Sequence, residues 1–189
     1  MSASPHHAQR HTVTATEYLR MTEAGVFAET RLELMEGEII DMAPIGSRHA
    51  AVVNTLAALL VRLAGERAIV SVQNPLIADD KSVPQPDLML LKYRADRYFD
   101  AYPMAGDVLL VVDVSDTTLR FDLDTKIPLY ARAGIPEVWV IDVESRRLLA
   151  FSDPDAGTYR ACRAVSGSEQ VAVPEILDAA ITVATFFPA

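Results

Sequence analysis

Two apolar runs of the sequence each carry a carboxylate at one end. Asp87 opens the run 88–91, and Asp113 follows the run 108–112. Burying a carboxylate beside such a strand is costly unless a cation or a metal compensates its charge. Mg²⁺ prefers oxygen ligands and often takes one or two carboxylates together with substrate phosphate. If the two runs are neighbouring strands, Asp87 and Asp113 form a candidate magnesium site.

A cation lies on the helix expected after the second run. Lys126 is four residues after Asp122, so both side chains share one helix face. An ammonium group there could stabilise charge at a scissile phosphate or orient the attacking water. Ser115 shares a strand face with Asp113, because residues two apart point the same way. These residue types favour metal-assisted hydrolysis of a phosphodiester.

Each of these residues also has a purely structural interpretation. Asp87 could simply begin a strand after a turn, and Asp113 could pair with Lys126 in a plain buried ion pair. His49 could pack at the start of a helix or contact a substrate. Asp122 could be a first-turn acid that favours the helix dipole. The residues taken alone leave both interpretations open.

The composition limits the class of protein. The 189 residues suit one domain, and we expect it to span 13–189 after a disordered tail at 1–12. A net charge of −9 argues against tight nonspecific binding of nucleic acid, unless arginines cluster locally. The single cysteine, Cys162, excludes an internal disulfide, fits the cytoplasm and is expected to be packed. We expect no membrane segment and no signal peptide.

Apolar spacing predicts the helices that position the candidate residues. A helix is expected over 49–64, capped by Ser47, and another over 119–133, which Pro128 should kink or restart. A short helix should follow the capping box at Thr14.

Alternation and turn residues predict the strands. Around Gly37, they predict an N-terminal hairpin. Further strands are expected over 68–76, 87–91, 108–114, 138–142, 147–151, 158–163 and 169–173. The last three should form an antiparallel extension at the sheet edge. The fold class is therefore α/β, with a mixed central sheet flanked by helices.

Four stretches carry a resemblance to a known family. They are RLELMEGEI at 31–39, the helix start at His49, Pro86-Asp87-Leu88, and DVSDTTLRFDLDTKIPLYARAGIPEVWVID at 113–142. With them the chain resembles the Uma-type endonuclease family, a branch of the PD-(D/E)XK superfamily, over roughly residues 14–187. The resemblance implies a restriction-endonuclease-like core and a magnesium-dependent nuclease site.

The resemblance also implies a role for individual residues. The first acid, which follows a proline, is Asp87, and the second, usually Glu, is Asp113. The superfamily's lysine two residues later is replaced here by Ser115, and the family supplies Lys126 from the next helix instead. The backbone carbonyl of Val114 is a further candidate metal ligand.

A glutamate of the N-terminal hairpin completes the family's site. Glu33 matches it better than Glu36, which remains an accessory candidate with His49 and Asp122. Asp113 is one methylene shorter than the usual Glu, a difference in reach of about 1.5 Å.

We therefore expect a DNA endonuclease that uses Mg²⁺, with Mn²⁺ as a substitute, and acts as a homodimer to cut both strands. One alternative is a degenerate nuclease fold that serves as a binding or scaffold module, which the acidic charge and Asp113 favour. Another is a nuclease that acts on RNA, or on branched or single-stranded DNA.

Overall fold

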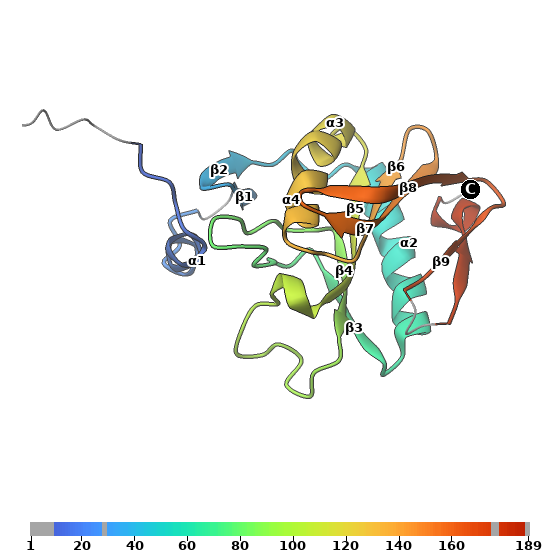
Figure 1. Ribbon diagram of the computed structural model, residues 1–189, viewed down its shortest axis with the longest axis horizontal. Coiled ribbons are helices and arrows are strands. Elements are labelled where there is room, and N and C mark those ends of the chain that lie inside the picture. The colour runs from blue at the N-terminus through green and yellow to red at the C-terminus, as the bar shows by residue number, and fades with distance from the viewer. Residues whose placement is uncertain (1–9, 28–29, 175–177, 188–189) are drawn as a thin grey trace, which may run out of the picture.

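A computed structural model describes residues 10–27, 30–174 and 178–187 (Figure 1). Most of the expected tail at 1–12 thus lies outside the described residues. Among the described residues, no helix is long and apolar enough to cross a membrane.

A mixed six-stranded sheet forms the centre of the fold, in the order β3-β4-β5-β6-β7-β8. Its strands are β3 (Ala68–Val72), β4 (Leu88–Lys92), β5 (Val108–Ser115), β6 (Glu137–Asp142), β7 (Arg147–Asp155) and β8 (Thr158–Ser166). Only the β5–β6 pair is parallel, and the helical segment between them makes the crossover. The expected mixed α/β class is confirmed.

Helices cover both faces of the sheet (Figure 1). The helices are α1 (Ala15–Glu23), α2 (Ser47–Ala64), α3 (Leu119–Phe121) and α4 (Ile127–Arg132). Short 3₁₀ turns span Ala105–Asp107 and Val183–Phe186. A π-helical turn, Asp122–Lys126, joins α3 to α4, and Pro128 falls in the first turn of α4. The α-helix thus restarts at Ile127, with Pro128 in its first turn, where a proline's missing N–H is tolerated.

The alternation of β5 sorts its side chains between two cores. Leu110, Val112 and Val114 pack in the cluster beneath α2, whereas Val111 packs in the cluster beneath α4. Asp113 lies two residues after Val111 and therefore points toward the α4 side. The strand period thus directs the carboxylate to the face that carries Lys126.

Two small hairpins flank the sheet. The expected N-terminal hairpin is confirmed as β1 (Leu32–Met35) and β2 (Glu38–Asp41). The segment expected at 169–173 forms β9 (Gln170–Ala172), which pairs with β10 (Ala180–Thr182) and not with the central sheet. The extension is therefore split, and only β7 and β8 continue the central sheet.

Three local expectations were wrong. The strand from residue 68 ends at Val72, where Gln73 takes a φ of +50° and leaves the extended conformation. Gly46, not Ser47, precedes the first turn of α2, and no side chain caps it. Cys162 is exposed because it lies on β8, the edge strand, whose residues mostly face solvent.

Gly37 provides a test of the hairpin's position. Its φ is +84°, and an added Cβ would lie 2.9 Å from the Cβ of Thr12. Gly25 has a φ of +75°, but an added Cβ there would meet nothing within 4 Å. Left-handed strain should cost about 1 kcal/mol in Gly25→Ala, and the clash should add about 1–3 kcal/mol in Gly37→Ala. Urea unfolding of both variants measures the difference, and equal losses would contradict the packing described here.

Candidate active site

Asp87 and Asp113 lie side by side on adjacent strands. Leu88 of β4 pairs with Val112 of β5, so the residue before Leu88 is level with the residue after Val112. Asp87 Oδ2 accepts a hydrogen bond of 2.8 Å from the backbone N–H of Val114. Both carboxylates line one cavity of about 120 Å³. The register of two strands is therefore what brings the two acids together.

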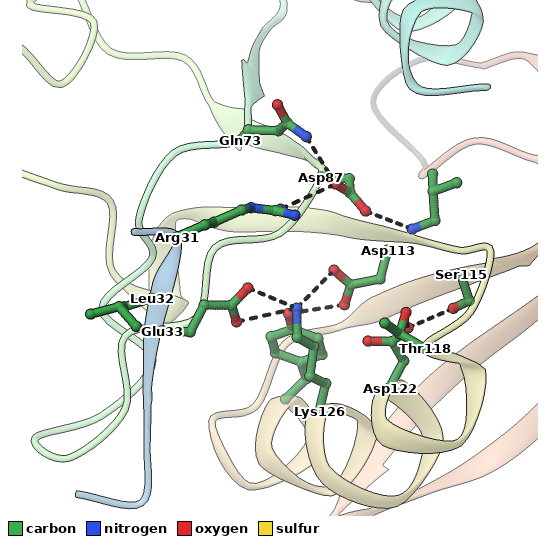
Figure 2. Close-up of polar contacts among 12 residues, drawn as sticks. Arg31, Leu32, Glu33, Gln73, Asp87, Asp113, Ser115, Thr118, Asp122 and Lys126 are labelled. Atoms are coloured by element: carbon green, nitrogen blue, oxygen red, sulfur yellow. Dashed lines mark hydrogen bonds and ion pairs between the residues drawn. The ribbon is translucent and has the colours of Figure 1, made fainter. Parts of the chain in front are cut away.

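Lys126 lies between two buried carboxylates (Figure 2). Its Nζ is 3.2 Å from Glu33 Oε2 and 3.5 Å from Asp113 Oδ1. Asp113 is 2% exposed, Lys126 3% and Glu33 0%. The second oxygen of Asp113 accepts a hydrogen bond of 3.0 Å from the Tyr130 hydroxyl. The hairpin, the sheet and the π-helical turn thus meet at one ammonium group.

The π-helical turn positions Asp122 as well as Lys126. The Ile127 N–H donates to the Asp122 carbonyl five residues back, which is the π-helical pattern. The side chain of Asp122 accepts hydrogen bonds from Ser115 Oγ at 2.6 Å and Thr118 Oγ1 at 2.7 Å (Figure 2). Ser115 therefore orients Asp122, and the cation of the site comes from the helix. Asp122 lines the same cavity as Asp113.

Asp87 is surrounded by donors. His49 Nε2 lies 2.9 Å from its Oδ1, and Gln73 Nε2 donates to the same oxygen at 3.2 Å. The Arg31 guanidinium lies 3.7 Å away. Burial raises the pKa of Asp87, but the hydrogen bond and charge of His49, together with hydrogen bonds from Val114 and Gln73, leave this pKa below its usual value. Asp87 is therefore held as a carboxylate.

His49 responds in the opposite sense. Burial lowers the pKa of its imidazole, but the hydrogen bond and charge of Asp87 raise the pKa above the ordinary value overall. Contact with the backbone of Val114 adds to this rise. His49 lines the cavity, so its ring faces the same space as the carboxylates. The structure thus pairs His49 with Asp87 and does not leave it as a packing residue alone.

Negative charge exceeds positive charge around Lys126. Burial raises the pKa of Asp113, Lys126 lowers it, and the carboxylates of Asp122, Asp87 and Glu33 raise it, which leaves this pKa at about 7. Burial likewise raises the pKa of Glu33. For Lys126, burial lowers the pKa, but the surrounding carboxylates raise it well above its usual value. The ammonium therefore stays charged, and the carboxylates compete for it.

The donor set fits a divalent cation in ligand type and charge. Asp87, Asp113 and Asp122 offer hard oxygen atoms to one cavity. Glu33 Oε2 is buried without a hydrogen bond, although Lys126 lies within ion-pair distance. In the described part of the chain, however, no three His, Cys, Asp or Glu side chains converge in a ready-made metal cluster. Binding would therefore require carboxylates such as Asp87 to exchange their present donors.

The structure brings most of the candidate residues predicted from sequence together and leaves one of them elsewhere. At one cavity it brings together three hydrogen-bonded groups, which contain Glu33, His49, Asp87, Asp113, Ser115, Asp122 and Lys126. Glu36 lies apart, exposed and paired with Arg132. Val114 contacts Asp87 through its N–H, and the role of its carbonyl stays a prediction.

Besides Thr118, the site contains three further residues that were not predicted from the sequence. Tyr130 could have been found, because it follows Lys126 by four residues on the same helical segment. Arg31 just precedes the hairpin strand that carries Glu33, but its partner is Asp87. Gln73 gave no signal, because its role depends on where β3 ends.

Comparisons with known proteins agree with this architecture. The sequence pattern of the Uma2 family, described as "Putative restriction endonuclease", matches residues 15–185. The crystal structure of a putative nuclease belonging to DUF820 from Anabaena variabilis ATCC 29413 matches with a TM-score of 0.72 and 14% identity. The match covers 93% of this chain and 97% of that one, and at this identity it shows the fold alone. No curated protein matches the chain.

The raised pKa of Asp113 makes a prediction about stability. The folded protein binds this proton more tightly than the unfolded chain, so stability falls as pH rises from the ordinary pKa of 3.8 to about 7. At about pH 8, Asp113→Asn should raise the free energy of unfolding by about 1–2 kcal/mol, because the substitution removes the cost of ionising a buried carboxyl while Lys126 still pairs with Glu33. At about pH 5 the gain should be smaller, because the folded wild-type carboxyl is already protonated, and it should vanish only below about pH 3.8, where the unfolded chain is protonated as well.

Urea unfolding at both pH values measures this difference. Asp124→Asn is the matched control, because its side chain is 64% exposed and pairs only with Arg120 in an i,i+4 contact. Destabilisation of Asp113→Asn at the higher pH would show that the ionised carboxylate stabilises the fold as a simple ion pair.

Proposed function

Because the chain belongs to the Uma2 family of putative restriction endonucleases, we propose that it is a nuclease that hydrolyses phosphodiester bonds in DNA with the help of Mg²⁺. The observation that carries the proposal is the placement of Asp87, Asp113 and Lys126 around one cavity. Carboxylates from neighbouring strands, with a buried cation beside them, form the arrangement that metal-assisted hydrolysis requires.

In this proposal Asp87 and Asp113 hold the metal ion, and the Val114 carbonyl is a further candidate ligand. A bound divalent cation would supply a polarised water molecule and neutralise charge that develops on the phosphate. Mn²⁺ offers the same charge and accepts the same oxygen ligands. The remaining groups act through the chain's own hydrogen bonds and charges.

Lys126 would hold a phosphate oxygen or the attacking water. Its pKa is raised, so it acts as a permanent cation and hydrogen-bond donor. Glu33 and Tyr130 would position the Lys126–Asp113 pair. Glu33 contacts the ammonium group, and Tyr130 donates a hydrogen bond to Asp113. Ser115 would position Asp122 beside the cavity through the hydrogen bond that its hydroxyl donates.

Arg31 and His49 would contact the substrate at the other end of the cavity. Both line it and both lie against Asp87. If Asp87 turns toward a metal ion, these two side chains are released to bind phosphate oxygens, which a guanidinium binds well. Donor exchange at Asp87 would thus couple metal binding to substrate binding. Cutting both strands of a duplex would be simplest in a homodimer.

A second candidate function follows from the same donors. The four contacts around Asp87 would also suit a degenerate site that has lost its metal and serves as a binding module. This alternative predicts folding and partner binding without hydrolysis.

Cleavage assays separate the two functions. We expect plasmid and oligonucleotide DNA to be cut with Mg²⁺ or Mn²⁺ but not with EDTA. Asp87→Asn and Lys126→Met should each lower the rate at least about 100-fold. Glu36→Gln, at an exposed residue outside the cavity, should cleave at the wild-type rate. Thermal melting verifies that each variant is folded.

Cleavage that persists unchanged in Asp87→Asn would come from another site or from a contaminating nuclease. Absence of cleavage by the folded wild type on every substrate form would favour the binding module.

Metal binding can be measured without a substrate. Calorimetric titration should detect Mg²⁺ and Mn²⁺ binding in the millimolar range or tighter, and Asp113→Ala should abolish it. The affinity should increase between about pH 6 and 8, because the Asp113 carboxyl, with its pKa of about 7, must lose its proton to bind a metal. Asp124→Ala should bind as the wild type does. If the wild type does not bind either metal, the proposed metal dependence is wrong.

A further inference from the structure

A second cavity lies against the first turn of α2. Its volume is about 340 Å³, and it belongs to none of the groups described above. Val52, Val143 and Phe187 form apolar walls, and two arginines, Arg48 and Arg146, stand at its edge. The volume falls in the range of pockets that bind small organic groups. The exposed Glu144 also lines the cavity, which is thus apolar within and has two cations and one anion among its lining residues.

The first turn of α2 lies between this cavity and the active site, because its residues line both. Gly46 and His49 line the catalytic cavity, whereas Arg48 and Ala51, interleaved with them in sequence, line the second one. Arg48 Nη1 lies 3.5 Å from Asp116 Oδ1, and Asp116 lines the catalytic cavity. A ligand in the second cavity would therefore be close to a phosphate in the first.

The floor of the second cavity is tied to the strand that carries Asp113. The Val143 N–H donates to the Ser115 carbonyl at 3.0 Å. Ser115 in turn holds Asp122 of the active site. A backbone hydrogen bond therefore joins a residue that lines the second cavity to the strand that carries Asp113.

The chemistry of the second cavity matches a nucleobase. A base is flat and largely apolar on its faces, and it stacks on aromatic rings and on guanidinium planes. Arg146 Cζ lies 5.2 Å from the centroid of the Phe187 ring, so a guanidinium already stacks on an aromatic wall here. The side chain of Arg48 is 60% exposed and can reach the phosphate that links two nucleotides.

We propose that this cavity binds the base of a nucleotide that flanks the scissile phosphate. The proposal rests on the proposed nuclease function and specifies that the nucleotide beside the cut is unpaired, either in a single strand or flipped out of a duplex at an energetic cost. A base inside the cavity cannot pair with a complementary strand. The burial of Asp113 and Lys126 agrees with this, because a phosphate must enter a small cavity to reach them. A single strand can enter more easily than a stiff duplex.

Abasic substrates test the proposal. The probe is a fluorescent single-stranded DNA oligonucleotide, together with a series in which one base is removed at each successive position. Binding is measured by anisotropy with EDTA, and cleavage with Mg²⁺. Removal of one particular base should weaken wild-type binding about tenfold. A blunt duplex of the same sequence should bind more weakly than the single strand.

Two variants on α2 form a matched pair. Ala51→Phe fills the cavity, so its binding should no longer respond to the missing base. Ala58→Phe makes the same change at an exposed position of the same helix and should keep the tenfold response. If Ala51→Phe fails to fold, Arg146→Met replaces it, because Arg146 is exposed and its guanidinium, stacked on Phe187, is the group expected to stack on the base, so the response should fall too.

The outcomes are distinct. An equal response to the missing base in Ala51→Phe and the wild type would overturn the base site, as would duplex binding as tight as single-strand binding. Base-dependent binding without any cleavage would support the cavity but refute the nuclease function. Cleavage without any dependence on a flanking base would support the nuclease and refute the cavity.

Discussion

The rest of the structure depends on the buried ion pairs that the Lys126 ammonium group forms with two carboxylates. The ammonium group lies between Glu33 of the hairpin and Asp113 of the central sheet, and all three side chains are almost fully buried. These residues come from segments that are far apart in sequence, so one cation ties the hairpin and the helical crossover to the sheet. Because it must balance more than one carboxylate, it also leaves an excess of negative charge in the core.

That excess is difficult to explain by stability alone. A buried ion pair often contributes less than well-packed apolar residues of similar volume, because two charges must be removed from water. Here the arrangement is less favourable than a simple pair, since burial and neighbouring carboxylates hold the pKa of Asp113 near 7. A cavity adjoins these acids, where an ion or a phosphate can reach them. The charges are therefore better explained by chemistry than by folding.

Much of the fold could be predicted from the sequence because its signals are local. The period of β5, the restart at Pro128 and the glycine of the hairpin are each encoded within a few residues. The strand register that puts Asp87 beside Asp113 could not be predicted. The sequence showed only that the two acids would meet if their strands were neighbours. The pairing of β9 with β10 could not be predicted, because it depends on a long-range contact between two short segments.

In the candidate site, too, local sequence signals could be predicted and long-range contacts could not. The two acids stood out because carboxylates are unusual beside apolar strands, and the family resemblance pointed to Glu33 and Lys126. The donors around Asp87 depend on tertiary structure: Arg31, His49 and Gln73 come from three different segments. No local pattern could show that they converge, nor that Ser115 would bind Asp122.

The most direct test of this account is a crystal structure with Mn²⁺, in which anomalous scattering locates the metal. The account predicts one strong peak in the cavity, about 2.1 Å from carboxylate oxygens of both Asp87 and Asp113. Arg31 and His49 should then have moved away from Asp87. A structure at saturating Mn²⁺ with no peak in this cavity, and with Lys126, Arg31 and His49 still in their present contacts, would contradict it.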